Sequence, residues 1–396
     1  MFLSQSNWRL SLRQRILNVT PSDFDALSLD LFRYQARHNA VYAEYLHHLR
    51  RLPDEVQSLD EVPFLPINFF KTHRVLIPDV ANSTEFASSG TSGATTSRHL
   101  VADLPLYDAI CQRLFEDTYG PLRQFHILGL LPSYLERNNS SLVYMVQRFM
   151  ALSGSDQSGF FLNNYAELTA RLRHLTNEAE ATGLASKVLL IGVTFGLLDW
   201  VEQTAGSLQW VGTHPGLVVM ETGGMKGRRR EMLCEEVHAE LTEKLGVSAI
   251  HSEYGMTEML SQAYSAGEGT FAPAATARVL LRDPNDPFDL APTRRRGGIN
   301  VIDLANVDSC AFLETKDLGS YVGHDGSFRV LGRFDNADLR GKLRDLKAAL
   351  PDGARVLTAE QAATLDAFTA DGVTPLAMAG AEYPAGQLYY ELALSK

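Results

Sequence analysis

The chain has 396 residues, with 36 lysines and arginines against 47 aspartates and glutamates, and a formal net charge of −11 at pH 7. Hydrophobic residues make up 45% and charged residues 21%, which excludes a disordered or fibrous chain. The acidic balance argues against non-specific binding to nucleic acid or to an anionic membrane surface. This length predicts a large core and two to three domains of roughly 150 residues each.

The cysteines and the N-terminal residues indicate the cellular compartment in which the protein is expected. Cys111, Cys234 and Cys310 are too few and too scattered for a disulfide framework or a cysteine-based zinc site. No apolar run approaches the roughly 20 residues that a membrane helix needs. The N-terminus lacks a continuous apolar core and a small-residue cleavage site, unlike a signal peptide. We therefore expect a cytoplasmic, soluble protein with no membrane span and no nucleic-acid partner.

The N-terminal part, about residues 8–52, is predicted to be helical. Apolar and aromatic residues at near-helical spacing over 22–51 predict one or two helices there, with Ser22 as a cap. The aromatic-rich segment 63–71 contains Pro63 and Pro66, and proline does not fit a helix interior. We expect an extended connection over these residues.

Short apolar runs alternate with amphipathic stretches between residues 86 and 313. The runs at 125–128, 188–191, 217–220 and 247–250 predict buried strands, and the stretches at 104–117, 166–181 and 229–245 predict helices. This alternation predicts an α/β fold with a mainly parallel sheet. Shorter strands are predicted after residue 270, at 299–303, 311–314 and 328–331, and a small α+β unit after residue 333.

Residues 88–97 have the sequence SSGTSGATTS, ten small residues of which seven carry a hydroxyl. A loop of this kind wraps phosphate oxygens well, because glycine lets the backbone approach and serine or threonine adds donors without bulk. It lacks the Gly-Lys-Ser/Thr ending of a Walker A loop. A flexible linker is the alternative on composition alone. Strand-like flanks at 83–87 and 98–102 favour a hairpin loop.

A second loop, residues 221–230, follows a buried strand and precedes a helix. Its lysine and three arginines lie close to the start of the predicted helix, where the helix dipole disfavours positive charge. A bound anion nearby would offset this unfavourable interaction. For the arginines we favour a solvated basic surface paired with neighbouring glutamates. Gly223 and Gly224 indicate a place where a ligand or another segment of the chain approaches the backbone closely.

A third loop, residues 251–258, is expected at the carboxyl end of a strand, where open α/β sheets bind ligands. Tyr254 can stack on a base, Thr257 can donate to phosphate and Glu258 can hold Mg²⁺. The alternative is a capping turn in which Thr257 and Glu258 open a helix. Two later segments, 314–319 and 332–338, contain Asp317, which can accept ribose hydroxyls, and Arg333, which can reach a sugar or phosphate.

Taken in this order, the loops resemble motifs of the adenylate-forming superfamily of acyl-CoA synthetases, adenylation domains and firefly luciferase. Residues 88–97 are similar to its phosphate loop, 254–258 to its Tyr-Gly-x-Thr-Glu motif, 314–319 to its Thr-Gly-Asp region and 332–335 to its Gly-Arg-x-Asp hinge. Residues 32–42, 63–71 and 221–227 most resemble the acyl-protein synthetases, the long-chain-fatty-acid–luciferin-component ligase type. Phenylacetate–CoA ligases are the next nearest family by pattern.

The resemblance implies a fold and a two-step reaction. The fold is α/β, with a large multi-sheet adenylate-forming domain over residues 1–332 and a short α+β lid domain over 333–396. A carboxylic acid, expected to be a fatty acid, attacks the α-phosphate of Mg-ATP to give an acyl-adenylate and pyrophosphate. The acyl group then passes to a thiol, such as that of coenzyme A, or to a carrier or other protein. Catalysis of this kind is mostly charge neutralisation and alignment.

The resemblance also implies site residues. The expected roles are β- and γ-phosphate binding by Ser88, Ser89, Gly90, Thr91, Ser92 and Gly93; adenylate binding by Gly223, Gly224, Tyr254 and Gly255; α-phosphate binding by Thr257; Mg²⁺ binding by Glu258; ribose binding by Asp317 and Arg333; and a hinge at Asp335. Of these, Thr257, Glu258 and Arg333 are the expected catalytic residues.

Three features of the family's pattern are absent. Thr95 and Thr96 stand where the phosphate loop usually ends in Pro-Lys, and no Gly-Lys pair occurs near the C-terminus. The last cysteine is Cys310, before the hinge, whereas acyl-protein synthetases carry their acceptor cysteine late in the chain. We therefore expect the acyl acceptor to be a separate molecule.

Three functions stay open from the sequence. The first is an acyl-protein-synthetase-like ligase, the second a phenylacetate-type acyl-CoA ligase and the third a non-catalytic nucleotide- or acyl-binding relative. A hydrolase is not expected, because the sequence has no Gly-x-Ser-x-Gly elbow and no His-Glu-x-x-His motif.

Overall fold

The computed structural model describes residues 5–78, 83–88, 96–132, 139–183, 186–223, 232–284, 286–290 and 294–333, together with two short strands further on. The chain divides into two compact units, Met1–Leu331 and Gly332–Lys396. In the second unit the short strands β15 (Arg355–Leu357) and β16 (Tyr389–Glu391) pair antiparallel. The first unit holds the two large sheets and all of the described helices.

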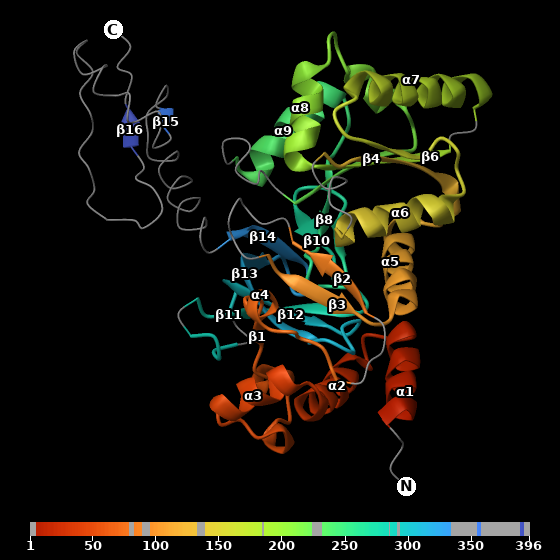
Figure 1. The fold of residues 1–396 in the computed structure, drawn as a ribbon. Coiled ribbons are helices and arrows are strands. Elements are labelled where there is room, and N and C mark those ends of the chain that lie inside the picture. Colours follow the sequence, from red (N-terminus) through yellow and green to blue (C-terminus); the bar gives the residue numbers. More distant parts are fainter. Residues whose placement is uncertain are drawn as a thin grey trace. The chain divides into compact units, whose positions relative to one another are not determined.

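A mostly parallel sheet forms one half of the first unit (Figure 1). Its strand order is β5-β4-β6-β7-β8-β9, and all neighbours pair in parallel except β8 and β9. The strands are β4 (Phe125–Leu130), β5 (Gly159–Phe161), β6 (Lys187–Val193), β7 (Leu217–Thr222), β8 (His251–Tyr254) and β9 (Ala263–Ser265). The central strand β6 is buried over nearly its whole length, as expected for a strand covered on both faces.

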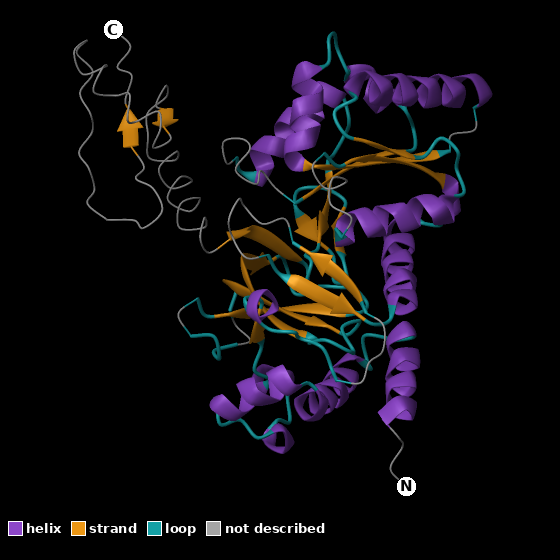
Figure 2. Cartoon of the chain, viewed as in Figure 1, coloured by secondary structure: helices purple, strands orange, loops and turns teal. Residues whose placement is uncertain are grey.

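Helices cover both faces of this sheet (Figure 2). Helices α7, α8 and α9 lie on one face and α6 on the other. These helices and the preceding helix α5 have the following bounds: α5 (Leu104–Tyr119), α6 (Ser141–Ser153), α7 (Tyr165–Thr182), α8 (Thr194–Gln203) and α9 (Cys234–Leu245). Because each parallel strand needs a crossover to the next, the sequence alternates strand and helix here. None of the described helices has the length and apolar character that crossing a bilayer requires.

The second sheet of this unit is antiparallel, in the order β10-β14-β13-β12-β11, with the short strand β1 added in parallel to β13. Its strands are β1 (Leu65–Pro66), β10 (Thr270–Phe271), β11 (Ala277–Arg282), β12 (Arg296–Asp303), β13 (Phe312–Tyr321) and β14 (Phe328–Arg333). A separate hairpin consists of β2 (Thr84–Ala87) and β3 (Arg98–Val101). The hairpin predicted around residues 88–97 is thereby confirmed.

The N-terminal helices pack beside the second sheet. They are α1 (Gln5–Leu17), α2 (Phe24–His38), α3 (Ala40–His48) and the short α4 (Phe69–Thr72). Buried amides fix them there: Gln35 Nε2 donates to the carbonyl of Asn306 at 2.6 Å, and Asn39 Nδ2 to that of Ser309 at 2.9 Å. The Phe32 and Tyr42 rings pack on Phe312 of β13. The predicted N-terminal helices are confirmed.

Four local predictions were wrong. Ser22 is not the helix cap, because α2 has Asp23 at its N-cap without a side-chain hydrogen bond. Segment 63–71 is not extended throughout, since α4 begins at Phe69 after the strand β1. Residues 247–250 connect α9 to β8 and form no strand; ladder pairing with β7 starts only at His251, opposite Met220. Residues 232 and 233 of the helix predicted over 229–245 are not helical, because α9 begins at Cys234; residues 229–231 lie outside the described ones.

Candidate nucleotide-binding site

Two of the predicted site residues meet where the two sheets of the first unit adjoin. Tyr254 ends β8, at the carboxyl edge of the parallel sheet, and Asp317 lies in β13 of the antiparallel sheet. The Tyr254 hydroxyl donates to Asp317 Oδ2 at 2.9 Å. Ligands of open α/β sheets bind at the carboxyl ends of the strands. The structure thus joins two motifs that are 63 residues apart in sequence.

The Tyr254 ring is held by aromatic neighbours. Its centroid lies 5.8 Å from that of Phe271 and 5.8 Å from that of Phe328, and these two phenylalanines stack on each other at 5.4 Å. Only 9% of Tyr254 is exposed. Packing therefore fixes the direction of its hydroxyl, while stacking of the ring on adenine stays a prediction.

A buried arginine supplies positive charge near this pair. Arg282 is 4% exposed and donates to the carbonyl of Thr315 at 2.7 Å and to Asn300 Oδ1 at 2.8 Å. Burial lowers the pKa of Arg282, and the charges of Glu314 and Asp317 oppose this shift. Arg282 was not predicted as a site residue, because it occupies the last position of an otherwise ordinary strand.

A glycine makes room for this arginine. Gly298 pairs with Arg282 across the β11–β12 ladder, and a Cβ at Gly298 would lie 2.6 Å from the Arg282 Cζ atom. The guanidinium is held by several hydrogen bonds, so it has no freedom to retreat. The Gly297-Gly298 pair is the sequence signal that could have pointed to a close approach here.

Thr257 and Glu258 lie in a turn that leads into β9, so the alternative in which they open a helix is wrong. The buried Asp303 carboxylate anchors the residues just beyond: Oδ2 accepts from the Leu260 amide at 2.7 Å and Oδ1 from the Ser261 hydroxyl at 2.6 Å. Burial raises the pKa of Asp303, although these hydrogen bonds oppose the shift. The turn is therefore fixed from its C-terminal side.

Two further polar residues hold the backbone of the turn itself. Asn306 Nδ2 donates to the Glu258 carbonyl at 2.9 Å. His99 of β3 lies with Nδ1 2.8 Å from the Thr257 carbonyl oxygen, and burial lowers the pKa of His99 to about 4, which keeps its ring neutral. Nδ1 is then the donor and Nε2 an acceptor. Neither residue was predicted, because nothing local in sequence marks a buried positioning residue.

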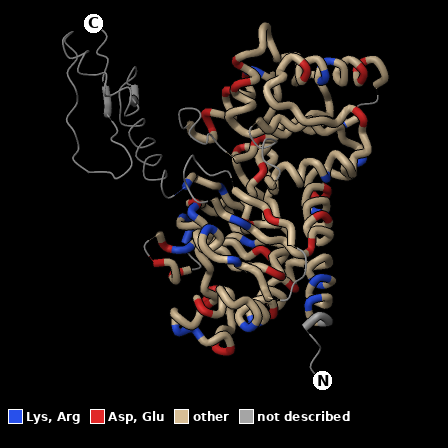
Figure 3. The backbone as a smooth tube through the Cα atoms, viewed as in Figure 1, with Lys and Arg blue, Asp and Glu red and all other residues tan. Residues whose placement is uncertain are grey.

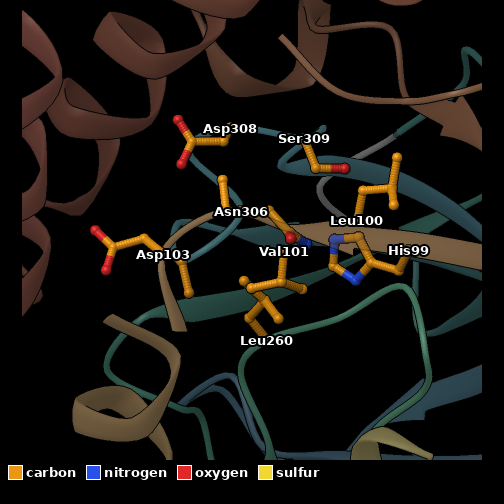
Figure 4. A pocket seen from close by; sticks show the side chains of 10 residues that line it. His99, Leu100, Val101, Asp103, Leu260, Asn306, Asp308 and Ser309 are labelled. Carbon is orange, nitrogen blue, oxygen red and sulfur yellow. The ribbon is translucent and has the colours of Figure 1, made fainter. Parts of the chain in front are cut away.

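A small pocket lies behind this turn, lined by His99, Leu260 and Asn306 among others (Figure 4). Its volume of about 10 Å³ suits roughly one water molecule. His99 Nε2 and Asn306 Oδ1 are both buried, and the Asn306 side chain lies close enough to His99 to oppose the lowering of its pKa. The pocket is too small for a nucleotide, and we assign it to support of the turn.

The hairpin β2–β3 presents the predicted phosphate loop. At its base the Ser88 amide donates to the Ser97 carbonyl, and the Ser97 amide donates to the Ser88 hydroxyl, each at 3.0 Å. Ser88 therefore closes the loop. The remaining predicted phosphate-binding residues, Ser89, Gly90, Thr91, Ser92 and Gly93, lie outside the described residues. Because His99 on this hairpin contacts Thr257, the hairpin and the turn are fixed to each other.

The end of β7 lies beside the same turn. The Thr222 hydroxyl donates to the buried carboxyl of Glu253, and Gly223 follows with a φ of 90°. Gly224 and the basic cluster at 226–230 lie outside the described residues. Gly255 is exposed, and a Cβ there would lie 2.4 Å from Glu253 Oε1, so any larger residue would displace the Glu253 carboxyl group.

We expect Glu253 to make stability depend on pH. Burial raises its pKa from 4.5 to about 7, the Thr222 hydrogen bond opposes this, and the charge of Glu221 adds to it. The folded chain then keeps a proton that the unfolded chain releases. Wild-type stability, relative to Glu253→Gln, is therefore highest below pH 4.5 and falls by up to about 3 kcal/mol as the pH rises through about 7.

Urea unfolding of both proteins at about pH 5 and about pH 8 checks this expectation. Exposed Glu243 on α9 offers a matched control, since Glu243→Gln should follow the wild type at both values. An unfolding difference between wild type and Glu253→Gln that is the same at both pH values would show that Glu253 does not titrate as stated.

The donor set at the turn suits Mg²⁺. Glu258 supplies a carboxylate and Thr257 a hydroxyl, which are the hard oxygen ligands that Mg²⁺ prefers. Glu258 is 5% exposed, and the backbone on both sides of it is fixed by Asn306 and Asp303. Arg333 is exposed at the end of β14, and Asp335 lies outside the described residues.

Basic and acidic residues are interspersed along the backbone of the described part of the first unit (Figure 3).

No protein-family model matches the sequence, and no curated protein matches it. Solved structures do match. One is 2-hydroxyisobutyryl-CoA ligase in the postadenylation state with R3-HIB-AMP, at 13% identity and a TM-score of 0.57, covering 82% of this chain and 70% of that one. The same enzyme with 2-HIB-AMP and CoA in the thioesterification state gives 14% identity and a TM-score of 0.53, covering 84% and 70%.

A further match is ATP-bound MatB from Rhodopseudomonas palustris, at 17% identity and a TM-score of 0.46, covering 64% of this chain. The chain spans about half of the MatB structure, 48% of its length. The two ligase structures with the higher scores show the fold. The predicted α/β class, with several sheets in an adenylate-forming ligase fold and a separate second unit, is confirmed.

Proposed function

We propose that the chain activates a carboxylic acid with ATP, forming an acyl-adenylate and pyrophosphate, and then transfers the acyl group to a thiol or protein acceptor. The observation that carries the proposal is the hydrogen bond between Tyr254 and Asp317. It unites the predicted adenine-binding and ribose-binding residues at the carboxyl edge of the parallel sheet, in a fold shared with a ligase that binds HIB-AMP.

The proposed roles follow from position and chemistry. Asp317 accepts the ribose hydroxyls, and Tyr254 orients Asp317 while its ring contacts adenine. Thr257 donates to the α-phosphate from a turn that His99 and Asn306 hold in place. Residues 88–93 and the backbone at Gly223, Gly224 and Gly255 surround the phosphates and the adenylate. Arg333 stays the second proposed ribose ligand.

Charge neutralisation is the main chemical requirement, because the reaction brings a carboxylate against a polyphosphate. Glu258 would hold Mg²⁺, which supplies positive charge at the phosphates when bound. Buried Arg282 keeps a permanent cation close to Asp317 and Glu314, which limits the repulsion between these carboxylates and the nucleotide. Such preorganised charges need no rearrangement during the reaction.

The acyl acceptor is proposed to be a separate molecule, coenzyme A or a carrier protein. Cys111 and Cys310 are 2% and 0% exposed. Burial raises the pKa of Cys310 to about 12 and that of Cys111 well above its usual value. A thiol must ionise to attack an acyl-adenylate, so neither cysteine is a suitable nucleophile. By resemblance, fatty acids are the substrates to test first.

Acid-dependent exchange of labelled pyrophosphate into ATP tests the first step. Addition of coenzyme A, and then of candidate carrier proteins, to the preformed adenylate tests the second. Rapid thioester formation with coenzyme A would identify a CoA ligase of the phenylacetate type. Transfer only to a protein would identify an acyl-protein-synthetase-like enzyme, and stable acid or nucleotide binding without exchange would identify a non-catalytic relative.

A further inference from the structure

Three side chains of the kinds that bind transition metals meet where β7 ends and α9 begins. They are Glu221, Cys234 and His238, and one ligand atom of each lies within 4.8 Å of the other two. Cys234 Sγ is 3.4 Å from His238 Nε2, and Glu221 Oε1 is 3.7 Å from the same nitrogen. Cys234 and His238 are four residues apart on α9, so they share one face of the helix.

Two of the three separations between these ligand atoms are compatible with binding of one zinc ion. Zinc lies about 2.3 Å from sulfur and about 2.0 Å from nitrogen, so two ligands at a tetrahedral angle are roughly 3.5 Å apart. The sulfur-to-nitrogen distance of 3.4 Å agrees with this value. The oxygen-to-nitrogen distance of 3.7 Å is a few tenths of an ångström longer than the roughly 3.4 Å expected for a carboxylate oxygen, a difference that a small side-chain movement can remove. A fourth polar atom, Ser252 Oγ, lies 3.3 Å from His238 Nε2.

The carboxylate of this cluster is prepared to act as a ligand. Thr194 donates its hydroxyl proton to Glu221 Oε2 at 2.6 Å, while the other oxygen, Oε1, is the one near His238. Orientation of a ligand by an outer hydrogen bond is usual around protein metal sites.

We propose that Glu221, Cys234 and His238 bind one Zn²⁺ ion, with a water molecule in the fourth position. The thiolate and imidazole favour zinc over Mg²⁺ or Ca²⁺, which prefer oxygen ligands. One thiolate and one carboxylate balance the ion's two positive charges. Cys234 is exposed, which gives the ion a path from solvent, whereas Glu221 and His238 are largely buried, with 15% and 11% of their side chains exposed.

This site goes beyond the proposed function and does not depend on it. It would tie α9 to the end of β7, next to Thr222 and the loop that begins at Gly223. Because the ligands come from two elements and the unfolded chain has no preformed site, bound zinc should stabilise the fold. The bound zinc ion would then have a structural role, holding α9 to the end of β7 beside the proposed nucleotide site.

Cobalt substitution tests the site on the full-length chain. After removal of metals by a chelator under reducing conditions, Co²⁺ is titrated and the absorption spectrum recorded. We expect one Co²⁺ per chain, a thiolate-to-cobalt charge-transfer band and the visible bands of a four-coordinate ion, all lost when Zn²⁺ is added. Cys234→Ser should lose the charge-transfer band and His238→Gln the tight binding, whatever the enzymatic activity.

Matched controls come from the same chain. His48 and Glu44 on α3 form an exposed pair with the same separation of 3.7 Å but no cysteine, so His48→Gln should leave the cobalt spectrum unchanged. Circular dichroism confirms folding, which exposed Cys234→Ser should not disturb. No stoichiometric Co²⁺, a six-coordinate spectrum, or an unchanged charge-transfer band in Cys234→Ser would overturn the proposal.

Discussion

Asp317→Ala should lower acid-dependent ATP–pyrophosphate exchange by about 100- to 10,000-fold. Asp317 is proposed to accept both ribose hydroxyls, and a hydrogen bond to a charged group contributes about 1.5–3 kcal/mol. The substitution also removes the partner of the Tyr254 hydroxyl, which is 2.9 Å away in a largely buried position. The measurement is kcat/KM for ATP in the exchange reaction.

Two variants separate ribose binding by Asp317 from mere support of Tyr254. Tyr254→Phe removes the hydroxyl but keeps the ring packed on Phe271 and Phe328 and keeps the carboxylate, so its loss should be about tenfold or less. Asp325→Asn, at an exposed turn after β13, should leave exchange unchanged. Equal losses in Tyr254→Phe and Asp317→Ala would show that Asp317 acts only through the tyrosine.

Glu258→Ala should lower exchange by about a thousandfold or more and should raise the Mg²⁺ concentration needed for half-maximal rate. The carboxylate is the proposed Mg²⁺ ligand, and a bound metal ion contributes several kcal/mol of charge stabilisation at phosphate groups. Its backbone is fixed by Asn306, so loss of the carboxylate should not be compensated by movement of the turn. Rates are measured across a Mg²⁺ titration.

Because Glu258 is 5% exposed, a folding defect must be distinguished from loss of the ligand. Glu258→Gln keeps the shape and removes the charge, and it should show the same loss with little change in thermal unfolding. The exposed control Glu243→Gln should behave as wild type. A Glu258→Gln enzyme with near-normal exchange and normal Mg²⁺ dependence would contradict the assignment of Glu258.

The sequence predicts most of the parallel sheet but not all of its bounds. Buried strands such as β6 are continuous apolar runs, which are easily recognised. The apolar run 247–250 was wrongly predicted to be a strand. Apolar character indicates that a segment is buried, but not that it pairs with a neighbouring strand: Ile250 is 1% exposed and yet is not part of a strand. The hairpin β2–β3 was found from its strand-like flanks, and its loop, 89–95, lies outside the described residues.

The site was predicted only where its residues form local motifs. Tyr254, Thr257 and Glu258 are close in sequence, and Asp317 lies in a second motif. The residues that hold them cannot be found this way, because each acts through a contact across more than 40 residues: His99 with Thr257, Asn306 with Glu258, and Asp303 with Leu260. Such contacts between buried polar groups depend on the three-dimensional fold and leave no local pattern in the sequence.

The proposed zinc ligands were beyond sequence prediction for the same reason. Three scattered cysteines do argue against a site made of cysteines alone. Only the fold brings Glu221, which is 13 residues before Cys234 in sequence, within ligand distance of His238. A mixed ligand set from a strand end and a helix face has no fixed spacing by which a sequence would reveal it.

Exchange of labelled pyrophosphate into ATP by the wild-type chain tests the proposed function most directly. The assay needs Mg²⁺, ATP and one carboxylic acid at a time, from a panel that covers short, branched, aromatic and long-chain acids. We expect exchange that requires the acid, and that is abolished by Asp317→Ala and by Glu258→Ala. A folded wild-type protein that gives no exchange above background with any acid of the panel would contradict the proposed function.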